Sequence, residues 1–212
     1  TMLSFIVTDI CATQQELQAC LLTAVNQSFN RITVDGDTST NDACTVSATN
    51  QSNIQLTDCR ETFQAALNKL TQDLAHKIVR DGEGATKFVE ICASGLVTNN
   101  DCLEVAYTVA HSPLVKTALF ASDANWGRIL AAVGRAKVDG LVIENINIFL
   151  NELPIITAGE LDINYSEEAG STEMEKTDIV ICIEMGDSPT SESVWTTDFS
   201  YDYVKINAEY RS

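Results

Sequence analysis

The sequence has little histidine, and this scarcity excludes several catalytic classes. Only His76 and His111 occur among its 212 residues, each at the end of a predicted helix. Two isolated imidazoles do not supply the ligand set of a zinc enzyme. No serine stands in a G-x-S-x-G segment, so the nucleophile of an α/β-hydrolase is absent as well. We therefore interpret both histidines as structural.

Basic residues are also few, with 13 lysines and arginines against 30 aspartates and glutamates. The formal charge of −17 repels the phosphates of nucleic acids and of anionic lipid surfaces. We expect no nucleic-acid partner and no membrane partner. Many carboxylates fall in residues 160–178 and 187–202, which we predict to form a solvated face.

Long apolar runs and paired cysteines are missing too. The longest apolar runs, such as residues 179–183, are too short to cross a bilayer. The seven cysteines are odd in number and show no CxxC spacing, which argues against a disulfide scaffold or a zinc ribbon. Most have apolar neighbours, where cysteine behaves as a small hydrophobe, so we expect a reducing, cytoplasmic compartment. Three prolines and 45% hydrophobic residues indicate a folded protein.

The remaining sequence alternates between two hydrophobic periodicities, one helical and one typical of strands. The predicted helices are residues 14–30, 60–79, 101–110 and 126–136, and a further helix that starts at Pro113 after the N-cap Ser112. The predicted strands are residues 2–8, 32–34, 44–49, 86–92, 145–150, 155–157, 179–184 and 194–199. This alternation favours a layered α/β fold. A loop signal at residues 95–100 predicts a division into domains 1–96 and 97–212.

Three polar segments are candidates for chemistry. DGDTSTND (residues 35–42) begins like a calcium loop, but Thr40 and Val46 stand where glycine and a bidentate glutamate belong, so a functional loop and a capped turn both stay open. DGEGATK (residues 81–87) presents Glu83 between two glycines and lacks the P-loop spacing, although a helix C-cap has the same pattern. The third, residues 120–128, holds Trp126 and Arg128, which packing alone explains equally well.

Six segments, in order along the chain, resemble the motifs of one family. They are TMLSFIVTD (1–9), DGDTSTND (35–42), DGEGATK (81–87), SPLVKTA (112–118), NWGRILAAVGR (125–135) and YVKINAEYRS (203–212). The family is that of the ornithine acetyltransferases, also called glutamate N-acetyltransferases. The resemblance runs from the first residue to the last, while residues 160–193 contain no matching motif.

The resemblance bears on the first residue, Thr1, which is not a methionine. A signal peptidase, a truncation or self-cleavage would each leave such an end. Because members of the family cleave themselves before a threonine, we expect this sequence to be the β chain and Thr1 its catalytic nucleophile. A threonine hydroxyl needs a base, and the α-amine freed by cleavage is partly neutral near physiological pH. Cleavage therefore creates nucleophile and base on one residue.

The resemblance also implies a fold, a reaction and a partner. The expected fold is an N-terminal-nucleophile-like layered α/β sandwich completed by the α chain, with a smaller C-terminal α/β domain, in an (αβ)2 heterotetramer. The expected reaction is a ping-pong transfer of acetyl from N2-acetyl-L-ornithine to L-glutamate. The oxyanion hole that it needs comes from the α chain in this family. No metal and no organic cofactor is implied, and acetyl-coenzyme A serves only some bifunctional members.

Three more residues match substrate contacts of the family, namely Glu83, Asn207 and Ser212. An asparagine offers donor and acceptor groups and a serine a hydroxyl, which suit the ammonium and carboxylate of an amino acid. From the residues alone, Asn207 and Ser212 fit a frayed terminus as well. Two other functions stay open: an N-terminal-nucleophile aminopeptidase or amidase, which passes the acyl group to water, and a non-catalytic paralogue.

Overall fold

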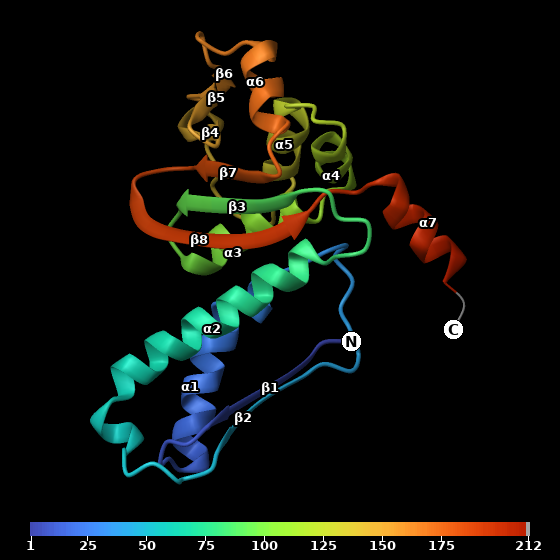
Figure 1. Ribbon diagram of the computed structural model, residues 1–212. Coiled ribbons are helices and arrows are strands. Elements are labelled where there is room, and N and C mark those ends of the chain that lie inside the picture. The colour runs from blue at the N-terminus through green and yellow to red at the C-terminus, as the bar shows by residue number, and fades with distance from the viewer. Residues whose placement is uncertain (211–212) are drawn as a thin grey trace. The chain divides into compact units, whose positions relative to one another are not determined.

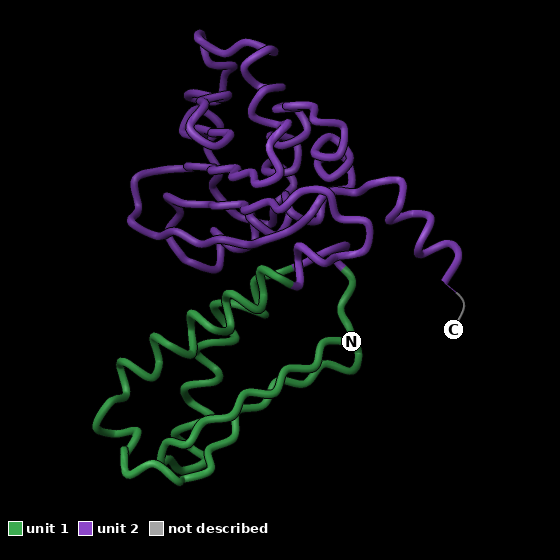
Figure 2. Tube along the Cα trace, viewed as in Figure 1, with its two compact units in different colours: residues 1–32, 37–77 green, residues 33–36, 78–212 purple. Residues whose placement is uncertain are grey.

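The computed structural model describes residues 1–210, and they divide into two compact units (Figure 2). Unit 1 comprises Thr1–Ile32 and Asp37–Lys77, and unit 2 comprises Thr33–Gly36 and the chain from Ile78 onward. The boundary predicted between residues 96 and 97 falls inside unit 2. The loop at that place joins a strand and a helix whose apolar residues share one core, so the backbone contacts divide the chain earlier.

Unit 1 combines a two-stranded parallel sheet with helices (Figure 1). Its elements are β1 (Leu3–Thr8), α1 (Gln14–Asn26), the 3-10 helix η1 (Phe29–Arg31), β2 (Ala43–Ala48), the 3-10 helix η2 (Leu56–Asp58) and α2 (Arg60–Arg80), whose last residues belong to unit 2. The strands pair in register, with Leu3 opposite Ala43. α1 begins at a capping box in which Thr13 and Glu16 satisfy each other's backbone amides. A small apolar cluster from α1, η2 and α2 forms the core.

Unit 2 is built on a six-stranded mixed sheet with the order β6-β5-β4-β7-β3-β8. The strands are β3 (Phe88–Gly95), β4 (Asn147–Leu150), β5 (Leu153–Thr157), β6 (Glu160–Leu161), β7 (Asp178–Glu184) and β8 (Ser188–Thr197). The helices are α3 (Asn99–Ala110), α4 (Pro113–Phe120), α5 (Trp126–Val133), η3 (Ile143–Asn145), α6 (Glu167–Met174) and α7 (Tyr201–Glu209). β3 and β7 run parallel, and the other neighbouring strands are antiparallel.

The two faces of this sheet differ in burial. Alternate residues of β3 and β7, such as Ile91 and Ile181, are fully buried in one core with apolar residues of α3, α4 and α5. The residues between them, such as Glu90 and Cys92, are only partly buried. This period of two is that of a strand with one face against helices, and it leaves the second face of the sheet partly open.

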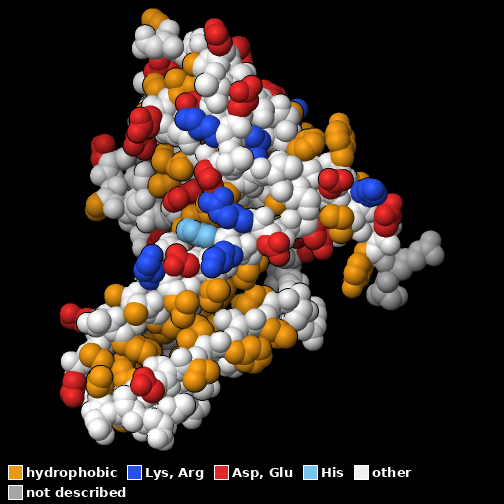
Figure 3. All heavy atoms as spheres, viewed as in Figure 1, with side chains coloured by type: hydrophobic (Ala, Val, Ile, Leu, Met, Phe, Trp, Pro, Cys, Tyr) orange, Lys and Arg blue, Asp and Glu red, His pale blue; other side chains and the backbone are white. Residues whose placement is uncertain are grey.

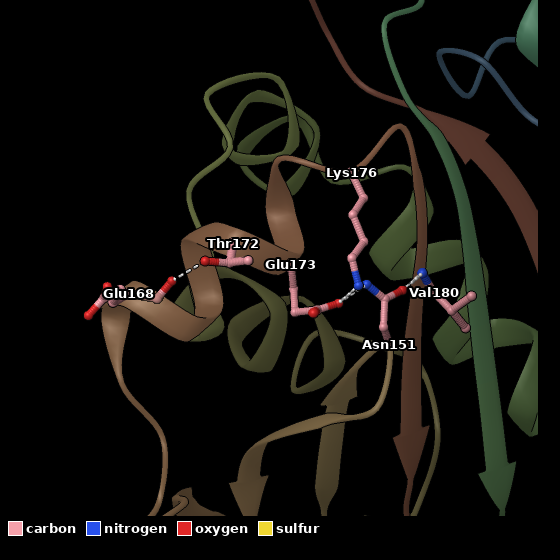
Figure 4. A network of polar contacts seen from close by, with 6 residues as sticks. All are labelled: Asn151, Glu168, Thr172, Glu173, Lys176 and Val180. Carbon is pink, nitrogen blue, oxygen red and sulfur yellow. Dashed lines mark hydrogen bonds and ion pairs between the residues drawn. The ribbon is translucent and has the colours of Figure 1, made fainter.

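A polar network joins α6 and the turn after β4 to β7 (Figure 4). The backbone amide of Asn151 donates to Val180 O at 2.7 Å, and Asn151 Oδ1 accepts from Val180 N at 2.9 Å. Asn151 Nδ2 and Lys176 Nζ each lie 2.5 Å from Glu173 Oε2. The hydrogen bond from Lys176, and then that from Asn151, lowers the pKa of Glu173. Every member has a structural partner, so we assign this network to the fold.

The mixed α/β class is confirmed, and so is each predicted helix, including α4 with its Ser112 cap and Pro113 start. One local prediction is wrong. Residues 32–34 form no strand, because that apolar segment connects the units and Thr33 N donates to Trp195 O instead. Two helices lie where no element was predicted, α6 in the polar stretch 167–176 and α7 near the C-terminus. Both helices are short and are fixed by serine N-caps, at Ser166 and Ser200, rather than by an apolar stripe.

Candidate functional site

Thr1 lies exposed just before β1, and the DGDTSTND loop fixes the backbone beside it. Met2 N donates to Asp42 Oδ1 at 2.7 Å, and Ala43 N donates to Met2 O at 2.9 Å. The bond from Met2 is the largest cause that lowers the pKa of Asp42, followed by a bond from Ser39. The positive α-amine of Thr1 makes a smaller contribution to the same shift. The end of the loop therefore holds a carboxylate near the proposed catalytic amine.

Glu83 lies exposed in the turn between α2 and β3, and the neighbouring glycine lets this turn pack on α7. Gly84 has a φ of +66°, and a Cβ there would lie 2.4 Å from Tyr203 N and 2.7 Å from Ser200 Oγ. Ser200 Oγ donates to Gly84 O at 2.6 Å and accepts from Tyr203 N at 3.1 Å. The Ser200 hydroxyl thus caps α7 and also joins the helix to the Glu83 turn. Only a glycine at position 84 lets the turn come this close to α7.

Glu83 and Asn207 are in direct contact. Asn207 Nδ2 donates to Glu83 Oε2 at 2.7 Å and to Tyr203 O, one helical turn earlier, at 3.0 Å. The two residues are 124 positions apart in the sequence. Both are exposed, so a carboxylate and an amide carbonyl stand side by side where they can accept hydrogen bonds from an ammonium group.

A buried carboxylate, that of Asp198, holds the DGEGATK segment in place. Asp198 follows β8 and is 1% exposed. Its Oδ1 accepts from Thr86 N at 2.9 Å, from Lys87 N at 3.0 Å and from Thr197 Oγ1 at 3.0 Å. Its Oδ2 accepts from Thr86 Oγ1 at 2.6 Å. A buried charge is stable only when it is satisfied in this way, and these bonds fasten the DGEGATK segment to the end of β8.

Lys116 of the SPLVKTA segment supports the same strand end. It is 1% exposed, and its ammonium donates to Thr196 Oγ1 at 2.8 Å and to Thr197 O. The ammonium also lies 4.7 Å from the centre of the Phe199 ring. Burial lowers the pKa of Lys116 to about 7, although the negative charge of Asp198 opposes the shift. Lys116 thus joins α4 to the end of β8, a few residues before α7 begins.

The start of the DGDTSTND segment contacts α7 and α3 within unit 2. Asp35 Oδ2 accepts from the Tyr203 hydroxyl at 3.1 Å. Gly36, with a φ of +91°, lies against the ring of His111, whose Nε2 is 3.1 Å from Thr33 Oγ1. Burial, and then the charge of Lys116, lowers the pKa of His111, so this ring is mostly neutral at pH 7. Its contacts support the structural role that we predicted for it.

The structure therefore brings Glu83 and Asn207 together, while Thr1 belongs to the other unit and Ser212 lies outside the described residues. The supporting residues Lys116 and Asp198 were not predicted. A lysine inside an apolar segment was the one signal for Lys116, and the burial of Asp198 has no sequence signal. Within residues 1–210, no group of three or more His, Cys, Asp or Glu side chains is placed to hold a metal ion. No helix in that range is long and apolar enough to cross a membrane.

Curated proteins similar to this chain include several that are named for arginine biosynthesis. The chain is 50% identical over 217 aligned residues to the arginine biosynthesis bifunctional protein ArgJ of Pseudomonas fluorescens, and 51% identical to that of Pseudomonas syringae pv. tomato. Each alignment covers 100% of this chain and 54% of the relative. The chain thus spans about half the length of the curated relatives it matches.

The fold is similar to a solved structure, that of the arginine biosynthesis bifunctional protein ArgJ of Bacillus halodurans. The two superpose with a TM-score of 0.92 at 37% sequence identity, covering 99% of this chain and 100% of the other. The layered α/β architecture is therefore that of the solved relative. The model of the ArgJ family matches residues 1–212. The chain belongs to the ArgJ family.

Proposed function

We propose that this chain is the β chain of an ornithine acetyltransferase that moves an acetyl group from N2-acetyl-L-ornithine to L-glutamate in arginine biosynthesis. Membership of the ArgJ family supports the pathway and the reaction class. The observation that carries the proposal is the 2.7 Å contact between Glu83 and Asn207. The resemblance assigns both residues to substrate binding, and in the fold they are in contact.

Thr1 is the proposed nucleophile. Its hydroxyl adds to the acetyl carbonyl while its α-amine takes the hydroxyl proton, and donors on the α chain stabilise the oxyanion. Collapse of the tetrahedral adduct returns the proton to the leaving amine, releases ornithine and leaves an acetyl ester on Thr1. The α-amine of glutamate then attacks that ester, and Thr1 is regenerated. No metal or organic cofactor enters either half-reaction.

Glu83 and Asn207 are the proposed recognition groups for the amino-acid part of the substrates. The Glu83 carboxylate complements the side-chain ammonium of acetylornithine, and Asn207 orients that carboxylate through its Nδ2. The Asn207 carbonyl is left to accept a further hydrogen bond. Ser212 is proposed as a further contact on the strength of the resemblance alone.

Unit 1 has an exposed apolar face, which is evidence in favour of an α-chain partner. Leu3, Phe5 and Val7 alternate along β1 and are 60%, 73% and 70% exposed. Figure 3 shows hydrophobic side chains gathered over this unit. Parallel strands are normally covered on both faces, so a two-stranded parallel sheet with an apolar outer face needs a partner. The relatives carry about half their length outside the match, and we propose that this half, the α chain, covers β1 in a cytoplasmic (αβ)2 assembly.

Mass spectrometry of the purified enzyme tests the proposal. After incubation with N-acetylornithine, we expect an increase of one acetyl group on the peptide that starts at Thr1, and its removal when glutamate is added. Thr1→Ala should give an uncut precursor that never acquires the label, because it has no hydroxyl for cleavage or acetylation. Thr1→Ser keeps the hydroxyl and should mature and transfer at a reduced rate.

The same experiment separates the transferase from an amidase. If water removed the acetyl group as fast without glutamate as with it, the chain would be a hydrolase. If no label formed on Thr1, or if Thr1→Ala still matured at the same bond, the assignment of the nucleophile would be wrong.

A further inference from the structure

Two cysteines lie opposite each other on neighbouring strands of the six-stranded sheet. Cys92 of β3 and Cys182 of β7 are direct register partners in the parallel pair. Neighbouring strands lie about 4.8 Å apart, and partners in register point to the same face. Disulfides join Cα atoms that are about 4.4–6.8 Å apart. The backbone therefore already holds this pair within the reach of a disulfide.

The pair lies on the partly open face of the sheet. Both cysteines are half-buried rather than enclosed in the core. Cys92 Sγ lies 3.6 Å from Ser191 Oγ on β8, and Ser193 Oγ on the same strand donates to Glu90 Oε1 at 2.7 Å. The sulfur of Cys92 thus lies on a polar side of the sheet next to the Ser191 hydroxyl, whereas the apolar core lies on the opposite side.

Their closeness makes the two thiols unequal. Interaction with the Cys182 thiol is the main cause that lowers the pKa of Cys92 to about 6, with help from Ser191 and Ser193. The same interaction, together with burial, raises the pKa of Cys182. A thiol of lowered pKa next to one of raised pKa suits an attacking and a resolving cysteine.

The other cysteines lack this arrangement. Cys20 and Cys102 are fully buried. Cys11 Sγ donates to Ser52 O at 2.6 Å, and Cys59 Sγ donates to Gln55 O at 3.6 Å, so each of these thiols uses its hydrogen on a carbonyl. Cys44 on β2 is half-buried like the pair, but its register partner is Ser4.

We propose that Cys92 and Cys182 form a redox-active dithiol, which a hydroperoxide oxidises to a cross-strand disulfide and an external dithiol reduces again. The Cys92 thiolate attacks the peroxide oxygen, the O–O bond breaks, and hydroxide leaves and takes up a proton as water. Cys92 is then a sulfenic acid. The Cys182 sulfur attacks it, loses its own proton and expels a second water. Two thiols and one hydrogen peroxide thus give one disulfide and two waters.

This disulfide would protect the enzyme from irreversible damage. A sulfenic acid with no neighbouring thiol is open to further oxidation to sulfinic acid, which most proteins cannot reverse. Because the register places Cys182 directly opposite Cys92, the resolving thiol is already on the neighbouring strand when the sulfenic acid forms. Neither cysteine belongs to the proposed acetyl-transfer site.

Peptide mapping of the mature enzyme, with both chains present, tests the proposal. The enzyme is treated with increasing hydrogen peroxide, unreacted thiols are alkylated under denaturing conditions, and a tryptic digest is analysed without reduction. We expect the peptide of residues 88–116 joined to that of residues 177–205, with fragment ions that assign the link to Cys92 rather than Cys102. Dithiothreitol should restore alkylation at both sites.

Single variants separate the two roles. Cys182→Ser should leave Cys92 as a sulfenic acid that a cyclic 1,3-diketone traps. Cys92→Ser should slow oxidation of Cys182 by about tenfold or more, because the attacking thiolate is gone. Cys44→Ser, at another half-buried strand position, is the matched control and should change nothing. Circular dichroism of each variant checks that the sheet is intact.

Three results would overturn the proposal. One is full alkylation of Cys92 and Cys182 at a peroxide dose that already oxidises Cys44. Another is a disulfide between any other pair. The third is an unchanged oxidation rate of Cys182 in the Cys92→Ser variant.

Discussion

At the level of single residues, the charge of Glu83 can be removed with little change of shape. In Glu83→Gln, the amide oxygen can still accept from Asn207 Nδ2, so the fold around the 2.7 Å contact should persist. The ammonium of acetylornithine loses a charge-assisted hydrogen bond, which is worth about 1.5–3 kcal/mol. We expect kcat/KM for acetylornithine to fall by roughly tenfold to a hundredfold, as measured by steady-state kinetics.

Asp81→Asn is the matched control, because it removes the same charge from the same segment without touching Asn207. It should change kcat/KM by less than about twofold. Equal losses in both variants would mean that the general negative field of the segment, rather than Glu83 itself, attracts the substrate.

The buried ammonium of Lys116 makes a prediction about pH. Burial lowers its pKa to about 7, whereas an unfolded chain holds a lysine near about 10.4. Between these values the unfolded state binds more protons, so the free energy of unfolding rises with pH across that window. The cost of burying the charge is present in full below pH 7 and is lost as the pH rises above it. Lys116→Met has no such titration.

Urea unfolding at pH 7 and pH 9 measures this difference. We expect the stability of wild type relative to Lys116→Met to rise by about 2 kcal/mol between the two values. The groups that face the ammonium, Asp35, Asp198 and His111, are common to both proteins. The exposed Lys137→Met should show no such rise. A difference that stays flat with pH would contradict the lowered pKa.

At the level of elements, the close approach between the Glu83 turn and α7 depends on Gly84. A Cβ at this position meets the backbone N of Tyr203 at 2.4 Å, so Gly84→Ala must push the start of α7 away. Asn207, on that helix, should then lose its contact with Glu83. We expect KM for acetylornithine to rise at least about tenfold, with a stability loss of about 1–3 kcal/mol.

Gly140→Ala isolates the steric part of this effect. Gly140 has a φ of +75°, similar to the +66° of Gly84, but no atom lies within 4 Å of the place that a Cβ would occupy there. The control therefore carries the conformational strain without the clash. If both variants raised KM equally, the packing of the turn on α7 would have no part in substrate binding.

Some helices and strands of this fold can be predicted from the sequence, and others cannot. Helices with an apolar stripe, such as α2, and strands of alternating residues, such as β3, follow from local periodicity. α6 and α7 do not follow from periodicity. Each is short and begins at a serine N-cap, Ser166 or Ser200, and a single serine does not by itself mark a helix in the sequence. The site divides in the same way. Motif resemblance singled out Glu83 and Asn207 as candidates, whereas the buried contacts of Lys116 and Asp198 arise between elements distant in sequence.

Considered as a whole chain, one polar segment, DGDTSTND, serves both units. Asp35 contacts Tyr203 in unit 2, and Asp42 binds the backbone of Met2 in unit 1. The same eight-residue segment is therefore bonded both to α7, which carries Asn207, and to the residue next to Thr1.

The outer face of β1 is the proposed binding surface for the α chain. Phe5 lies between Leu3 and Val7 and is 73% exposed, so Phe5→Asp places a charge at the centre of the apolar face. Burying an unpaired carboxylate costs several kcal/mol, and we expect the α chain to bind at least roughly a hundredfold more weakly. Co-purification with a tagged α chain, followed by light scattering, measures this. Ile163→Asp, at a residue that is 96% exposed in unit 2, should leave assembly intact. Normal recovery of the α chain with Phe5→Asp would show that another surface binds it.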